Sequence, residues 1–372
     1  MNNKLKRANN ILHIADIHFG KKNDSKLYQD LLEGFINRIP EIQKEFNHID
    51  AVIIEGDLFD RVIKMSENSS MYVIKFMEKL CDLTKKYGFY LRLIKGTLGH
   101  DYNQLRNFIH LEESYPLFKI INTATTENLE MGDYEYSILY LPEEYPEDYN
   151  KYYKNYLNKE YDYIFGHGMI DFVSFTGDEN IKRKITRNEA VHKVETLDNI
   201  CNYFVVFGHI HDMMNYKNKD KIMYVGSFER FSFADQEVKG FLLTRVDPET
   251  GDTEATFYEN ENASVYNILN LDDYEFESTE EKIKFIDEEK QKCDYLKVII
   301  NKEEENKDLL KGVLSSDIKI ESHNTIPEDV VDEKFMFLIR RELPVDQSIK
   351  KYIKLTINKD YKLEDINKYI TN

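Results

Sequence analysis

Five short motifs with carboxylate or imidazole side chains occur in the first 211 residues, and each follows an apolar run of strand length. In chain order they are Asp16-Ile17-His18, Gly56-Asp57-Leu58-Phe59-Asp60, Gly96-Thr97-Leu98-Gly99-His100-Asp101, Gly166-His167-Gly168 and Gly208-His209-Ile210-His211, with Gly226-Ser227 further on. In open α/β sheets, ligand sites lie beyond the carboxyl ends of the strands, where glycine lets the backbone turn sharply. The order therefore predicts Asp and His side chains that converge at one edge, as in a two-metal hydrolytic centre.

The residue types suit that chemistry. Two divalent cations about 3.5–4 Å apart can hold both the attacking and the leaving oxygen of a phosphoester. Mixed imidazole and carboxylate ligands suit Mn, Fe or Zn better than Ca or Mg, which prefer oxygen ligands. Asp57 is the expected bridging ligand, because its turn is central among the motifs. Asp16 and His18, two residues apart on an extended segment, would point the same way and hold one ion. His209 and His211 share that spacing, so each could face a metal.

A single Asp-x-His or His-x-His sequence is more often a polar turn than a metal site. The joint occurrence of the motifs, each after its own strand, favours a metal centre. The remaining histidines lack such a context, and we expect core or surface positions for them. They are His13, His48, His110, His192 and His323.

The order D-x-H, G-D-x-x-D, H-D, G-H-G, G-H-x-H resembles that of the calcineurin-like metallophosphoesterases. Within them it is similar to the SbcD-type nuclease subunit of complexes for DNA double-strand-break repair and phage recombination. Gly226-Ser227-Phe228-Glu229-Arg230 and Lys239-Gly240-Phe241 resemble the segment after the last histidine motif of those nucleases. The similarity covers about residues 10 to 245 and also suggests a phage member.

The resemblance implies a role for each motif residue and a cofactor of two divalent metal ions, with Mn expected and Mg, Fe or Zn as alternatives. One metal would be bound by Asp16, His18, Asp57 and His211, and the second by Asp57, His167 and His209. His100 would be the acid–base residue that assists the leaving oxygen, and Asp101 would orient it.

The third motif departs from the family pattern. The family has Asn directly before the histidine, as a ligand of the second metal, whereas this chain has Gly99 in a turn that is two residues longer. Glycine has no side chain to donate. Thr97, Asn103, a backbone carbonyl or water must therefore complete that coordination shell.

The apolar pattern predicts the elements that position the motifs. Leu27 to Phe46 and Met71 to Tyr87 have apolar residues at helical spacing. Strands are expected at Tyr136 to Leu141, Ile222 to Val225 and Gly240 to Val246, with a turn at 247–252. We expect a second sheet packed on the first, in a four-layer α/β/β/α sandwich with a small α+β C-terminal accessory region, which is also the fold that the resemblance implies.

Three regions are predicted: a metallophosphoesterase nuclease domain at 1–261, an acidic α/β capping domain at 262–326 and a helical C-terminal region at 327–372. The second has a helical pattern from Thr279. Its further expected elements are a strand at Tyr295 to Ile300, a helix at Lys302 to Ser315 and a strand at Ile318 to Glu321. The third has amphipathic helical stretches at Val330 to Leu343 and Gln347 to Leu355.

The resemblance implies DNA as substrate, a capping domain that contributes to DNA binding, and docking of the C-terminal helices on the coiled-coil base of an SbcC-type ABC ATPase. The resemblance is also consistent with a heterotetramer in which two copies of this chain form a homodimer. Packing of those helices on the chain's own core is an equally weighted alternative.

Composition sets limits on these expectations. The formal net charge of −18 is unusual for a DNA enzyme, although bound cations would offset the ligand carboxylates. Much of the acidity is concentrated in the tail and in expected surface runs such as 143–148. One basic cluster, Lys182-Arg183-Lys184 with Arg187, is as consistent with a DNA backbone contact as with a solvated loop. Cys81, Cys201 and Cys293 are widely spaced, which disfavours a disulfide framework or a Cys-ligated zinc site.

No apolar run approaches the roughly 20 residues of a membrane span, and no signal peptide is evident. We therefore expect no membrane association and a cytoplasmic location, in the host if the chain is phage-encoded.

Two function classes remain: a DNA nuclease subunit of an ATP-driven complex, and a free-standing phosphoesterase for a small nucleotide or metabolite. The C-terminal residues favour the first. A scaffold with a decayed site, suggested only by Gly99, is disfavoured by the otherwise complete ligand set.

Overall fold

The computed structural model describes residues 7–21, 23–172, 190–218, 220–301 and 318–323. Contacts between residues divide the chain into two compact units. The first takes in Met1–Asn267 with Gln291–Tyr295, and the second takes in Ile268–Lys290 with the chain from Leu296 onward. All predicted site residues belong to the first unit, which is an α/β structure built on two large mixed sheets.

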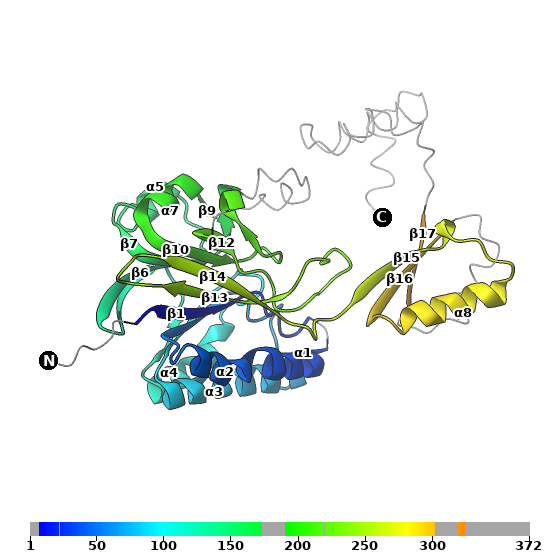
Figure 1. Ribbon diagram of the computed structural model, residues 1–372, viewed down its shortest axis with the longest axis horizontal. Coiled ribbons are helices and arrows are strands. Elements are labelled where there is room, and N and C mark those ends of the chain that lie inside the picture. The colour runs from blue at the N-terminus through cyan, green and yellow to red at the C-terminus, as the bar shows by residue number, and fades with distance from the viewer. Residues whose placement is uncertain (1–6, 22, 173–189, 219, 302–317, 324–372) are drawn as a thin grey trace, which may run out of the picture. The chain divides into compact units, whose positions relative to one another are not determined.

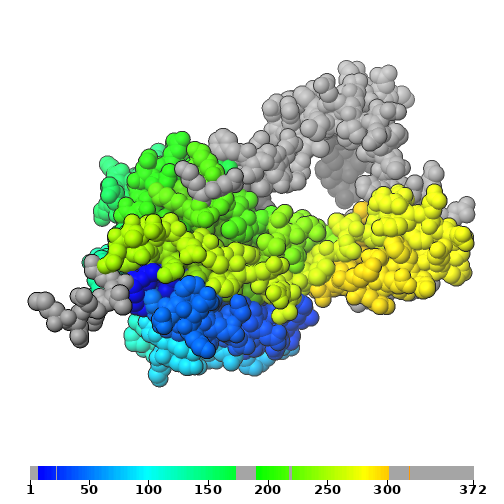
Figure 2. All heavy atoms as spheres, viewed as in Figure 1, coloured from blue at the N-terminus to red at the C-terminus, as the bar shows by residue number. Residues whose placement is uncertain are grey.

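The first sheet has the strand order β14-β13-β1-β2-β3-β4. Its strands are β1 (Asn9–Ile14), β2 (Ala51–Glu55), β3 (Tyr90–Ile94), β4 (Phe118–Ile121), β13 (Gly240–Val246) and β14 (Thr253–Glu259). β1 to β4 are parallel, and β13 and β14 add to β1 as an antiparallel hairpin. Figure 2 shows this returning hairpin as a yellow-green band between the blue N-terminal segment and the green middle of the chain. The loops after β1, β2 and β3 therefore open at one edge.

The second sheet has the order β11-β12-β10-β7-β6-β5. Its strands are β5 (Thr125–Met131), β6 (Tyr134–Leu141), β7 (Tyr161–His167), β10 (Cys201–Gly208), β11 (Met214–Asn215) and β12 (Ile222–Tyr224). β6, β7, β10 and β12 are parallel, with antiparallel edge strands β5 and β11. β8 (Met169–Ile170) and β9 (Val191–His192) form a separate short pair. Each strand predicted before a motif is confirmed, and so are the three later strands.

Both predicted helices are confirmed. The first consists of α1 (Asp24–Leu31), a π-helical turn η1 (Leu32–Ile36) and α2 (Arg38–Glu45), and the second is α3 (Asn68–Tyr87). The chain also forms η2 (Gln104–Phe108), α4 (Ile109–Ser114), α5 (Tyr149–Tyr153), α7 (Val194–Ile200) and η4 (Tyr216–Asn218). In Figure 1, α1 to α4 lie below the first sheet, and α5 and α7 lie above the second.

Alternation along the strands distributes apolar side chains between three buried clusters. Leu12 of β1 packs with the helices α1 to α3, whereas its neighbour Ile11 packs in a cluster that also contains Ile138 and Phe165 of the second sheet. The third cluster joins the opposite face of the second sheet to α5 and α7. Apolar burial is the main favourable term in folding, and the strands that lead to the motifs supply much of this buried surface.

The second unit contains α8 (Thr279–Lys290), η5 (Leu271–Asp273) and most of a three-stranded sheet of β15 (Tyr266–Asn270), β16 (Tyr295–Asn301) and β17 (Ile318–His323). β16 and β17 are parallel. The helix from Thr279 and the strands near Tyr295 and Ile318 are therefore confirmed. The helices expected at Lys302 to Ser315, Val330 to Leu343 and Gln347 to Leu355 lie outside the described residues. Within the part of the chain that the structure describes, no helix has the length and apolar character to cross a bilayer.

Helix α3 ends at a glycine that offers a stability test. Gly88 has φ 79° and ψ 22°, and its N–H donates to Thr84 O at 2.8 Å. An L-residue in this left-handed conformation costs about 1–2 kcal/mol, so Gly88→Ala should lower the free energy of unfolding by about 1 kcal/mol. Gly99→Ala is the matched control, because a Cβ there meets nothing within 4 Å and the backbone is not left-handed. Urea unfolding measures both, and an equal loss for the two variants would contradict the capping argument.

Candidate metal centre

The predicted metal-ligand residues and His100 come together where strands of both sheets end. Asp16 and His18 follow β1, Asp57 follows β2, His100 lies in the turn after β3, His167 ends β7, and His209 and His211 follow β10. Their side-chain nitrogen and oxygen atoms form overlapping groups in which all ligand atoms lie within 4.8 Å of one another. The expectation that these residues lie together is therefore met.

One group consists of Asp16, His18 and His211. The Nε2 atoms of His18 and His211 are only 3.1 Å apart, and Oδ1 of Asp16 lies 3.9 Å from Nε2 of His18. The backbone carbonyl of His211 is fixed by Ser227 N–H at 2.9 Å and by the buried Lys239 ammonium at 2.6 Å. The Gly226-Ser227 motif therefore holds the His211 loop in place.

A second group consists of Glu143, His167 and His209. Nδ1 of His167 lies 2.7 Å from the carbonyl oxygen of Glu55 and must donate to it, because a carbonyl has no proton to give. Nε2 of a neutral His167 is then a lone pair, yet it faces Oδ1 of Asp57 at 3.3 Å and Oε2 of Glu143 at 3.7 Å. The lone pair on Nε2 and the two carboxylates repel one another, so this arrangement is stable only if a proton or a cation lies between the nitrogen and the carboxylate oxygens.

Asp57 lies between the two groups. Its Oδ1 faces His167, and its Oδ2 lies 3.9 Å from Nε2 of His18 and equally far from Nε2 of His100. Burial acts to raise the pKa of Asp57, but His167 and His18 outweigh it and hold that pKa well below its usual range. Burial also acts to lower the pKa of His167, yet the Asp57 carboxylate raises it well above the ordinary value. Asp57 is thus charged and central, as a bridging ligand must be.

The backbone at these residues is strained. Asp16, His18, Asp57 and His209 have φ values of 50°, 56°, 48° and 99°, in the left-handed region that side chains disfavour. Such conformations cost on the order of 1–3 kcal/mol each and gather at functional sites. The extended, period-two geometry predicted for Asp16 and His18 is wrong, because β1 ends at Ile14 and tight turns place both side chains. His209 and His211 belong to different ligand groups, in agreement with the division between two metals that the resemblance implies.

Two glycines allow the turns to approach closely. A Cβ at Gly56, which has φ +78°, would lie 2.3 Å from Nδ1 of His167. A Cβ at Gly96 would lie 2.2 Å from both N and Oδ1 of Asp57. Any side chain at either position would push a ligand away, so both positions require glycine.

His100 is held by a group other than the one expected. Its Nδ1 lies 2.5 Å from the backbone carbonyl of Asp60, to which it must donate. Asp101 was expected to orient His100, but its two oxygens accept hydrogen bonds from the N–H groups of Phe59 at 3.1 Å and Gly96 at 2.7 Å. Burial, followed by the nearby Asp57 charge, raises the pKa of Asp101. Asp101 therefore braces the turn that contains His100.

Glu143 belongs to the site, although its acidic run is expected at the surface. Its side chain is buried, and its Oε2 lies 3.3 Å from Nδ1 of His209. Burial acts to raise the pKa of Glu143, but hydrogen bonding to His209 and the charge of His167 lower it to about 2. The sequence does contain a signal for this position, because Glu143 follows the strand β6 just as each motif follows its own strand.

The structure also distinguishes between the side chains that could take the place of the missing Asn ligand. A Cβ at Gly99 would meet nothing within 4 Å beyond its chain neighbours, so no other group packs against position 99. Asn103 is exposed at the start of η2. Thr97, by contrast, has Oγ1 at 2.9 Å from Oε2 of Glu143, 3.2 Å from Oδ2 of Asp57 and 3.4 Å from Nε2 of His167.

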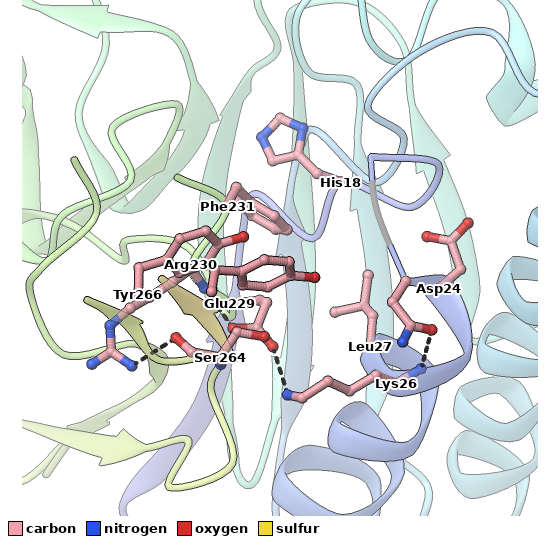
Figure 3. A pocket seen from close by; sticks show the side chains of 11 residues that line it. His18, Asp24, Lys26, Leu27, Glu229, Arg230, Phe231, Ser264 and Tyr266 are labelled. Atoms are coloured by element: carbon pink, nitrogen blue, oxygen red, sulfur yellow. Dashed lines mark hydrogen bonds and ion pairs between the residues drawn. The ribbon is translucent and has the colours of Figure 1, made fainter. Parts of the chain in front are cut away.

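A pocket lies beside the first ligand group (Figure 3). His18 and Phe231 form one end, with their ring centroids 5.2 Å apart. Farther along, the Lys26 ammonium is paired with Glu229 at 3.4 Å and with Asp30 at 2.6 Å. The Lys26 ammonium is therefore already paired within the protein. The basic cluster at 182–187 lies outside the described residues.

Among the side chains that the structure describes, the other histidines do not join these ligand groups. His13 is fully buried between Oε1 of Glu55 at 2.5 Å and Oγ1 of Thr244 at 2.8 Å, and burial lowers its pKa to about 3. His192 is buried against Tyr149, and His110 is exposed. Cys81 and Cys201 are buried and form no disulfide.

The donor set fits metal ions. Imidazole nitrogens and carboxylate oxygens converge in a buried setting, and Nε2 of His209 is buried without a hydrogen-bond partner. Buried polar atoms are normally satisfied, so this unpartnered imidazole nitrogen is an exception within the ligand groups. These His, Asp and Glu clusters can hold metal ions. The N and O donors suit Mn, Fe or Zn.

Comparisons with known proteins place few further limits. No family model matches the chain. No curated protein matches it either. Among solved structures, 84 chains show similarity; one of them is 13% identical and is aligned over 68% of this chain and 99% of its own length, with a TM-score of 0.38. At that level the similarity does not bear on function.

Proposed function

We propose that this chain is a metal-dependent DNA nuclease of the calcineurin-like metallophosphoesterase superfamily, similar to the SbcD-type nuclease subunit. The observation that carries the proposal is the meeting of two His and carboxylate groups at the strand ends, with Asp57 between them. We further propose that the two mixed sheets with their helices are the four-layer α/β/β/α sandwich of that superfamily, and that two ions bind, with Mn favoured over Mg, Fe and Zn.

Divalent cations bound here would polarise a phosphodiester and lower the pKa of a bound water. The chain's own residues supply the rest. Asp57 fixes the relative position of the two ligand groups. His100 is one-third exposed and donates its Nδ1 proton to Asp60, so its Nε2 is free to hold a proton and deliver it to the leaving oxygen. Asp101 keeps the turn in place through Phe59 and Gly96.

The partners are part of the same proposal. DNA is the proposed substrate, and an SbcC-type coiled-coil ATPase is the proposed partner in a heterotetramer that contains two copies of this chain. The regions 262–326 and 327–372 are proposed for DNA capping and ATPase docking, and a cytoplasmic location follows from the substrate. Because the net charge of this chain is −18, we propose that the ATPase provides most of the positive surface that binds DNA phosphates.

Activity assays on the full-length chain test the proposal. With Mn²⁺, we expect hydrolysis of bis-p-nitrophenyl phosphate and of linear duplex or single-stranded DNA, abolished by EDTA. Addition of a candidate SbcC-type ATPase with ATP should stimulate duplex degradation and allow co-purification. Hydrolysis of small nucleotides without any action on DNA would instead support the free-standing phosphoesterase.

A further inference from the structure

Glu143 is the residue that the site contains and the sequence motifs do not explain. It lies two residues beyond β6, and β6 pairs in parallel with β7 so that Leu141 is in register with Gly166. That register brings Glu143 beside His167, the next residue after Gly166. Its backbone N–H also donates to Lys95 O at 3.4 Å, which ties it to the turn after β3. Glu143 thus joins strand ends from both sheets.

The carboxylate of Glu143 is oriented. Its Oε1 accepts a hydrogen bond from the hydroxyl of Tyr145. Its Oε2 faces Nδ1 of His209 at 3.3 Å and Nε2 of His167 at 3.7 Å. Thr97 Oγ1 lies within hydrogen-bond distance of the same oxygen, at 2.9 Å. One oxygen is therefore fixed by a tyrosine, and the other points at two imidazole nitrogens.

A proton or a cation must lie between these atoms, and a divalent ion would displace the proton from Nε2 of His167. Nε2 of His167 is a lone pair in the neutral ring, since Nδ1 donates to Glu55 O. Two buried carboxylates, Asp57 and Glu143, face that nitrogen. Buried carboxylates that converge without a cation pay a large desolvation cost. With a divalent ion, the same atoms form a mixed nitrogen and oxygen coordination shell.

We propose that Glu143 supplies a carboxylate ligand to the second metal, in place of the amide that Gly99 does not provide, with Thr97 as the residue that positions it. This inference rests on the metal-dependent function proposed above. A carboxylate adds a negative charge where an amide is neutral. Because ligand charge tunes affinity for divalent ions, the second site should bind its ion more tightly than an amide-containing site would.

Metal titration of the full-length chain tests the assignment. Mn²⁺ binding is measured by calorimetry and equilibrium dialysis on metal-free wild type, Glu143→Gln, Glu143→Ala and Glu144→Gln. Altering groups that merely support a metal ligand typically costs about 10–100-fold in affinity, so loss of the ligand itself should cost at least as much. The second site should weaken at least about tenfold in Glu143→Gln, which keeps a neutral oxygen, and further in Glu143→Ala. The first site should be unchanged.

Glu144→Gln is the matched control. Glu144 is the next residue, but its oxygens accept hydrogen bonds from Ala124 N and Tyr152 Oη, away from the ligands. Electron paramagnetic resonance adds an independent signature. Wild type and Glu144→Gln should show the coupled spectrum of two neighbouring Mn²⁺ ions, and the Glu143 variants the spectrum of an isolated ion.

The outcomes separate the two proposals. Two ions bound with wild-type affinity and a coupled spectrum in both Glu143 variants would overturn the assignment of Glu143 alone. Fewer than two ions in the wild type would overturn the two-metal function and this inference with it. Melting in EDTA checks the fold: a cooperative transition in both variants shows that they are folded, and both should gain less than wild type on addition of Mn²⁺. If Glu143→Ala does not fold, the isosteric Glu143→Gln decides the matter.

Discussion

Replacement of Asp57 by Asn should abolish phosphodiester hydrolysis and weaken metal binding at both sites. Asp57 is the only described carboxylate whose two oxygens face both His167 and the pair of His18 and His100. Bound metals contribute several kcal/mol to transition-state stabilisation. A loss of ~4 kcal/mol corresponds to about 10³-fold in rate, so turnover should fall at least that far. Asp57→Ala should behave likewise.

The measurement combines metal analysis with activity on bis-p-nitrophenyl phosphate. Asp57→Asn keeps an acceptor for the Thr97 N–H, which lies 2.6 Å from Oδ1, so the turn should stay folded. Asp212→Asn is the control, because Asp212 directly follows a proposed ligand, yet its carboxylate is 44% exposed and pairs with Lys239. Wild-type metal content and activity in Asp57→Asn would refute the bridging role.

The fold was accessible from the sequence because its strands and helices have clear apolar patterns. β2 and β10 are near-continuous apolar runs, as expected of strands buried on both faces. In α3 the buried residues Val73, Phe76, Met77 and Leu80 follow helical spacing, and Gly88 ends the helix. The π-helical turn η1 was not predicted, since its residues continue the apolar spacing of α1 and α2.

The residues of the metal centre could be predicted from the sequence because each proposed motif ligand follows a strand in a recognisable motif. The local backbone geometry of the centre could not be predicted. Asp16 and His18 were expected to point the same way as on a strand, but their left-handed backbone results from hydrogen bonds across to the β2 turn, such as His18 N to Asp57 O at 3.0 Å. No local pattern encodes such a long-range contact.

Glu143 and Asp101 illustrate the same limit. Glu143 lies in an acidic run whose other members are partly or fully exposed, so composition alone pointed to the surface. Only the register of β6 on β7 shows that its side chain turns inward. Asp101 adjoins His100 in sequence, yet its oxygens bind the N–H groups of Phe59 and Gly96. Adjacency in sequence does not establish a side-chain contact.

Replacement of His100 by Ser should leave both metals bound while slowing hydrolysis of DNA by about 10²–10⁴-fold, the usual contribution of a general acid or base. The physical reason is the position of its Nε2, which is free of the hydrogen bond that holds Nδ1. The competing possibility has a definite basis, because His100 also forms a group of potential metal ligands with His18 and Asp57. Metal content therefore has to be measured alongside activity.

Leaving-group dependence separates the two roles of His100. An alkoxide leaving from DNA needs a proton, whereas p-nitrophenolate leaves readily without one. If His100 delivers a proton, His100→Ser should slow DNA cleavage far more than it slows bis-p-nitrophenyl phosphate hydrolysis. Leu98→Ala, in the same turn and 49% exposed, should be close to wild type on both substrates. Equal losses on the two substrates, together with lost Mn²⁺, would make His100 a ligand, and a near-normal rate on DNA would remove it from the mechanism.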